Sequence, residues 1–193
     1  SYSNTMNLSA DQLLTYSKGF GYHQVDILAG YTAQEETTKY LEGTGNQYPD
    51  DLVPYLSSAA IKSSNSSEYG WSMSAFFGRV NYSYKGKYLF SGTYRREGSS
   101  RFGLQNKWGN FPALSLGWRI SDEPFMAKYT WLNDLKLRGS WGVTGNNNIG
   151  NYSSLSFLNA SNYILANNFV NGQVVSSFAN TELGWEKSKQ TDI

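Results

Sequence analysis

The chain has 193 residues, a net charge of +1 and a mean hydropathy of −0.51. It contains no cysteine and one histidine, His23, which excludes disulfides, thiolate metal sites and multi-histidine metal sites. We therefore expect neither a metal nor a cofactor. No stretch approaches the ~18 consecutive apolar residues of a membrane helix, although a membrane-spanning strand escapes that test because only half of its residues are apolar.

The first two predicted strands cover residues 12–20 and 23–33 and are joined by a turn at Gly21-Tyr22. In the second of them, Val25 and Ile27 share one face while Asp26 lies on the other, because side chains alternate across a strand. Residues 35–72 are then expected to form a long polar connection, since they are rich in Gly, Ser and Asn.

Residues 75–98 give the clearest signal, a hairpin with an apolar and a polar face joined by a two-residue turn at Lys85-Gly86. A connection over 98–110 carries Arg101, Lys107 and Trp108. The remaining predicted elements are a strand at 111–120, a helical turn at 121–126 capped by Ser121 or Asp122 with Pro124 in its first turn, a strand at 135–144, a polar stretch at 145–180 and a seventh strand from Leu183.

The pattern therefore predicts an all-β antiparallel sheet of about seven strands with one apolar face. Two coverings suit such a face: a second sheet, as in a soluble β-rich binding module, or lipid, as in an outer-membrane barrel with an aqueous lumen. The residues expected on the covered face are Phe76, Val80, Tyr82, Phe90, Leu114, Leu116, Leu137 and Trp141. Those expected on the opposite face are Arg79, Asn81, Ser91, Arg119, Lys136 and Arg138. Long connections on one rim and short ones on the other favour the barrel.

Three segments resemble the barrel of the SusC/RagA class of TonB-dependent outer-membrane transporters. They are Tyr88–Gly103 (YLFSGTYRREGSSRFG), Gly109–Phe125 (GNFPALSLGWRISDEPF) and Leu135–Asn146 (LKLRGSWGVTGN), and Leu183–Lys187 (LGWEK) resembles the strand that follows them. The likeness is clearest from about residue 75 to the end, and residues 1–74 fit the preceding hairpin and loop more loosely.

The resemblance implies a transmembrane segment of a larger, 22-stranded barrel, in the outer membrane of a Gram-negative bacterium and crossing it several times. Residues 1–193 are then expected to be part of the barrel domain, with the plug domain and the remaining strands outside this excerpt. Family members import oligosaccharides or peptides, with a SusD-like surface lipoprotein and energy relayed by TonB. The expected partners are thus that lipoprotein, the TonB complex, membrane lipid and a glycan or peptide substrate.

No enzymatic activity and no nucleic acid partner are expected. The Lys and Arg residues of the middle third occupy strand positions and turns rather than one patch. His23 is expected to be a solvated residue at a strand end. The candidate ligand contacts are aromatic residues of the long connections, because sugars and peptides pack on flat rings: Tyr48, Tyr55, Trp108, Tyr152 and Tyr163.

Overall fold

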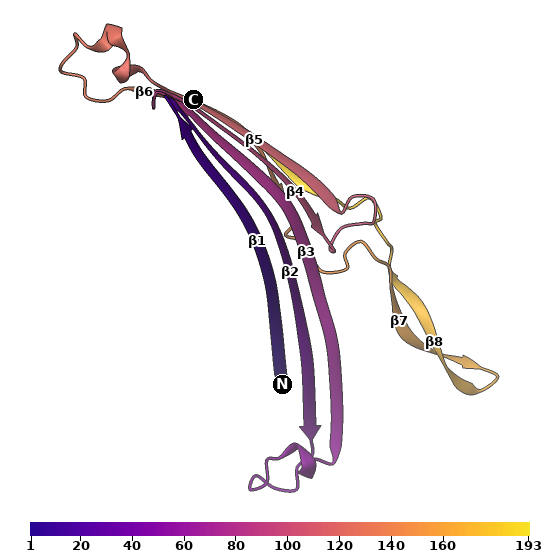
Figure 1. The fold of residues 1–193 in the computed structure, drawn as a ribbon. Helices are drawn as coiled ribbons and strands as arrows, with labels where there is room; N and C mark the ends of the chain where they lie inside the picture. The colour runs from indigo at the N-terminus through magenta and orange to yellow at the C-terminus, as the bar shows by residue number, and fades with distance from the viewer.

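The computed structural model describes all 193 residues and consists of one antiparallel seven-stranded sheet and a separate two-stranded hairpin (Figure 1). The strand order in the sheet is β1-β2-β3-β4-β5-β6-β9. Its strands are β1 (Tyr2–Phe20), β2 (His23–Asn46), β3 (Ile61–Tyr84), β4 (Tyr88–Ser99), β5 (Trp108–Arg119), β6 (Lys136–Asn146) and β9 (Glu186–Asp192). The hairpin pairs β7 (Phe157–Leu165) with β8 (Asn168–Ser177). The predicted all-β antiparallel class is confirmed.

Three short 3-10 turns complete the chain: η1 (Leu56–Ser58), η2 (Ile120–Asp122) and η3 (Pro124–Met126). None of these helical turns has the length or the apolar character that a membrane-spanning helix requires.

The predicted polar connection over 35–72 is wrong, because most of it is strand. β2 continues to Asn46, β3 begins at Ile61, and the two pair in unbroken register from His23↔Tyr84 to Asn46↔Ile61. β1 likewise begins at Tyr2 rather than at Gln12. On β2 beyond Ala33 and on the part of β3 that pairs with it, most residues of both faces are polar, so the apolar–polar alternation that reveals a strand in a sequence is lost there.

Two further predictions need correction. The polar stretch 145–180 contains the β7–β8 hairpin, whose turn residues Ala166 and Asn167 both have positive φ. Neither Ser121 nor Asp122 caps the helical turn at Pro124. Glu123 occupies that N-cap position, and its carboxylate makes no capping bond because it is bound by side chains of β4 and β5. A turn lies at Lys85-Gly86 as predicted, with φ values of 54° and 69°, but the connection is one residue longer than predicted, because Tyr84 pairs with Tyr88 and Lys87 is left in the turn.

The register places the predicted apolar set on one face of the sheet. Tyr82 pairs with Phe90 and Phe90 with Leu116, and in the next row Leu114 pairs with Trp141. The polar set shares the other face, where Asn81 pairs with Ser91 and Arg119 with Lys136. No second sheet covers the apolar face, and only ten residues of the whole chain are buried. The apolar face of the sheet is therefore exposed along these residues.

The connections alternate between two opposite rims (Figure 1), and the predicted sorting by length holds only in part, because segment 120–135 on one rim is longer than the 47–60 and 100–107 loops on the other. The short-turn rim carries the turns at residues 21–22 and 85–87 and the segment 120–135. The long-loop rim carries residues 47–60 and 100–107 and the long excursion 147–185 that includes the β7–β8 hairpin. β1, β2 and β3 extend well past the ends of β4 and β5 on the long-loop side.

Candidate functional site

Two loop segments of the long-loop rim converge and form a small core of their own. The Gly103 amide donates a hydrogen bond to the Leu183 carbonyl over 3.1 Å, and Trp185 Nε1 donates to the Lys107 carbonyl over 2.9 Å. The Trp185 ring lies 4.9 Å from the Phe102 ring, centroid to centroid, and Phe102 is only 1% exposed. This packing holds the loop before β5 against the segment before β9.

Gly103 is required by the closeness of that approach. A Cβ on Gly103 would lie 2.0 Å from the Thr181 carbonyl oxygen, closer than real Cβ atoms come to backbone. Any side chain at this position would push the two loop segments apart.

Arg101 connects the segment after β6 to the polar face of the sheet. Its Nε donates to Asn151 Oδ1 over 2.9 Å, and its guanidinium lies 4.9 Å from the centroid of the Trp71 ring. Trp71 Nε1 in turn donates to Glu36 Oε1 over 3.1 Å. A cation over an aromatic face is stabilising, most strongly on tryptophan. Arg101 thus connects the segment after β6, through Asn151, to Trp71 of β3, and Trp71 is bound to Glu36 of β2.

The five predicted aromatic contacts do not come together at one site. Tyr48 and Tyr55 lie in the 47–60 loop, and Tyr163 lies in β7 of the separate hairpin. Tyr55 is the most exposed of them at 68%. A cavity of about 460 Å³ has Trp108 in its wall without any of the other four.

Two of the five have structural contacts of their own. The Tyr152 hydroxyl accepts a hydrogen bond from the Gly70 amide over 3.0 Å and so ties its loop to β3. Trp108 is the first residue of β5 and lies, by register with Gly98 and Ser74, on the apolar side of the sheet. The Arg96 guanidinium lies 5.3 Å from the Trp108 ring centroid.

Sequence reasoning overlooked the residues that organise this rim, Trp71, Arg101 and Trp185. A tryptophan isolated in a serine-rich or asparagine-rich stretch was the available signal, because a large ring in polar surroundings usually has a packing partner. The pairing of Trp71 with Arg101 had no local signal, since it joins a residue of β3 to a residue of the loop between β4 and β5.

The short-turn rim carries a second polar network, around Glu123. Its Oε1 accepts hydrogen bonds from the Tyr88 hydroxyl over 2.7 Å and from Trp118 Nε1 over 3.1 Å, and Lys87 Nζ lies 3.6 Å from Oε2. The bond from Tyr88, the bond from Trp118 and the charge of Lys87 lower the pKa of the Glu123 carboxyl below its ordinary 4.5. The ionised carboxylate therefore pins the 120–135 segment to the ends of β4 and β5.

The chain is similar over its whole length to curated TonB-dependent receptors. It is 35% identical to TonB-dependent receptor P3 of Formosa agariphila, covering 100% of this chain and 20% of that protein. It is also 35% identical to TonB-dependent receptor SusC of Bacteroides thetaiotaomicron, covering 94% of this chain and 18% of that protein. The RagAB peptide transporter superposes with a TM-score of 0.86 and 25% identity over 98% of this chain and 21% of that chain.

The chain belongs to the SusC/RagA class of TonB-dependent receptors. It spans about a fifth of the length of the relatives that it matches. No family model matches it.

The segments that carry the sequence resemblance to this class correspond to strands and turns of the sheet. Residues 88–103 and 109–125 contain β4 and β5 with the loop and the helical turns that follow them, and residues 135–146 contain β6. The recognisable motifs are thus barrel strands and the turns between them.

Proposed function

We propose that this chain is the part of a SusC/RagA-type outer-membrane importer in which seven strands cross the membrane. On this proposal residues 1–193 belong to the barrel domain, and the plug domain and the other strands belong to the rest of a longer protein. The observation that carries the proposal is the uncovered apolar face, whose size and aromatic edges match a bilayer.

The height of the apolar band follows from the register. On β2 the outward row begins at His23 and its last apolar member is Ala33, after which Glu35 follows on the same face. Ten steps of ~3.3 Å span about 33 Å along the strand, and a tilt of ~45° reduces this to about 23 Å. An outer-membrane barrel has an apolar band of about 25 Å.

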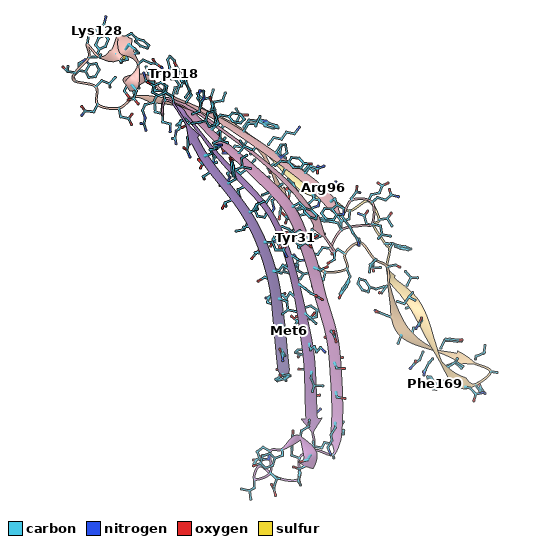
Figure 2. The ribbon with its side chains drawn as sticks, viewed as in Figure 1. Met6, Tyr31, Arg96, Trp118, Lys128 and Phe169 are labelled. Carbon is cyan, nitrogen blue, oxygen red and sulfur yellow. The ribbon has the colours of Figure 1, made fainter.

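Aromatic residues border the band on both sides. The row at the short-turn edge joins Tyr84, Tyr88 and Trp118, and near the long-loop edge lie Tyr31 and Phe76, with Trp108 one row beyond. Figure 2 places Trp118 at the short-turn end of the sheet and Tyr31 and Arg96 toward the other end. Two aromatic girdles flanking an apolar band are the expected mark of a barrel in a bilayer. A soluble binding module would need a second layer over this face, and these residues do not supply one.

The proposed activity is uptake of oligosaccharides or peptides, without chemistry on the substrate, together with a SusD-like lipoprotein and TonB. Support comes from the relatives, one named SusC and one described as a peptide transporter. We further propose that the long-loop rim faces the cell exterior, the short-turn rim the periplasm and the polar face the lumen. Among the loop rings we propose Tyr48, Tyr55 and Tyr163 as the ligand contacts, because the Tyr152 hydroxyl is bound to the Gly70 amide and the Trp108 ring lies beside Arg96.

Uptake by the full-length transporter tests this proposal. Replacing Tyr48, Tyr55 and Tyr163 together by Ala should reduce uptake of the substrate and leave barrel assembly intact. The matched control is Phe125→Ala, which removes an exposed ring from the opposite rim. Unchanged uptake in the triple variant would show that these three rings do not contact the substrate. An equal loss of uptake in Phe125→Ala would contradict the assignment of the long-loop rim to the cell exterior.

A further inference from the structure

A trough crosses the outward face of the sheet at the long-loop edge of the apolar band. Its floor is one register row of small residues on four neighbouring strands: Ala10, Ala33, Ser74 and Gly98. Trp108 continues the same row on β5 and closes the trough at one end. These residues line the cavity of about 460 Å³, and Lys107 lies in its wall.

Large side chains border the trough on the membrane side. In the adjacent row Tyr31 pairs with Phe76 and Phe76 with Arg96. Small residues between larger neighbours create the depression, and Gly98 is essential to its shape, because a Cβ there would lie 2.9 Å from the Trp108 ring. The ring therefore lies against the bare backbone of β4.

The trough has a cationic end. Arg96 is exposed, lies against the Trp108 ring and has no carboxylate within ion-pair distance, whereas its neighbour Arg95 pairs with Glu97 on the opposite face. Lys107 adds a second cation that forms no ion pair. An unpaired arginine held beside an aromatic ring can bind an oxyanion through two N–H donors.

The other end of the trough carries the opposite charge. Glu35 lies one row farther from the band than Ala33 and lines the same cavity. A carboxylate accepts hydrogen bonds from hydroxyl groups, while the exposed edge and face of a tryptophan suit the apolar side of a sugar ring. Cation, ring and carboxylate thus follow one another along one groove.

We propose that this trough binds the phosphorylated sugar headgroup of an outer-leaflet glycolipid. The phosphate lies against Arg96 and Lys107, the sugar packs beside Trp108 over the small-residue floor, and sugar hydroxyls reach Glu35. The inference rests on the proposed membrane placement, because that placement puts the trough at the depth of the outer-leaflet headgroups. Basic residues beside interfacial aromatic residues are the usual means of binding anionic headgroups.

Glycolipid bound to the full-length protein tests the site. The protein is extracted from outer membranes in mild detergent, stripped of lipid and titrated with purified lipopolysaccharide, with phosphatidylethanolamine and with inorganic phosphate, and bound lipid is measured by native mass spectrometry. Arg96→Gln should weaken lipopolysaccharide binding about tenfold or more, as expected for loss of a charge-assisted contact. Ser74→Phe, which fills the floor, should weaken it comparably. Arg79→Gln removes an unpaired arginine from the polar face and should leave binding unchanged.

The outcomes separate this inference from the proposed function. The glycolipid site would be overturned, with the protein still an outer-membrane barrel, by any of three results. Arg96→Gln could bind lipopolysaccharide as tightly as the wild type does, the wild type could bind phosphatidylethanolamine as tightly as lipopolysaccharide, or millimolar phosphate could displace the glycolipid. Failure of the wild-type protein to fractionate with the outer membrane, or to migrate as a heat-modifiable barrel, would instead overturn the proposed function, and the glycolipid site with it.

Discussion

A charge placed in the middle of the apolar band should destabilise the barrel far more than the same charge one residue away. Leu114 lies on β5 in the row that joins Ile27, Val80 and Trp141, near the centre of the band. An arginine on the lipid face costs about 2–4 kcal/mol at the membrane midplane and about 0–1 kcal/mol near its edges. Leu114→Arg should therefore shift the folding equilibrium by about 30- to 700-fold, at tenfold per 1.4 kcal/mol.

Two matched variants serve as controls for Leu114→Arg. Ser115→Arg adds the same charge on the polar face, in the row of Asn81 and Ser91, and should cost much less because that face is solvated. Leu137→Arg lies on the apolar face in the edge row of Trp118 and should fall between them. Folding of the full-length protein into phospholipid vesicles is measured over a urea series from heat-modifiable gel migration. Equal costs for Leu114→Arg and Ser115→Arg, or the reverse order, would refute the assignment of the faces.

Four other variants and insertions probe the loops and turns. Arg101→Ala should free the 147–155 segment from Trp71, so hydrogen exchange and protease cleavage there should rise, whereas Arg79→Ala should change neither. Gly86→Ala should cost about 1–2 kcal/mol because φ is positive there, while Gly139→Ala, in open space without a positive φ, should cost little. The pKa of Glu123 is lowered on folding, so its ionised carboxylate stabilises the 120–135 segment. That stabilisation is complete above the ordinary pKa of 4.5 and is lost as the pH falls through the lowered pKa. Trp118 fluorescence should follow that loss, and in Glu123→Gln the acid-dependent change should disappear. An epitope tag at Asn167 should bind antibody on intact cells and a tag at Lys85 should not; exposure of the Lys85 tag would reverse the two rims.

The strands that lie within the apolar band could be predicted from the sequence because one face is apolar and the other is polar. Residues 75–98, for example, form the predicted hairpin with a turn at the predicted place, and the predicted pairing of faces holds through β4, β5 and β6. The same rule failed for residues 35–46 and 61–72, where Glu35, Lys39 and Glu68 line the face that is apolar nearer the turn. A strand with polar residues on both faces is held by its backbone ladder, which leaves no periodic signal in the side chains.

The organisation of the long-loop rim could not be predicted for a different reason. Arg101 meets Trp71 and Asn151, and Trp185 meets Phe102, across separations that no local pattern encodes. The predicted aromatic residues were chosen by type and loop position alone, which cannot distinguish Tyr152, with its hydroxyl bound to the Gly70 amide, from the more exposed Tyr55.

Accessibility of successive β5 positions to reagents in lipid and in water tests the central claim most directly. Single cysteines at positions 113 to 117 of a full-length protein without other cysteines are treated in isolated outer membranes with a membrane-soluble or a membrane-impermeant thiol reagent. Labelling should alternate with a period of two, with Leu114 and Leu116 positions modified from the lipid and Ala113, Ser115 and Gly117 positions modified from water. Water-soluble labelling at all five positions, or alternation in the opposite sense, would contradict the membrane-spanning barrel with an outward apolar face.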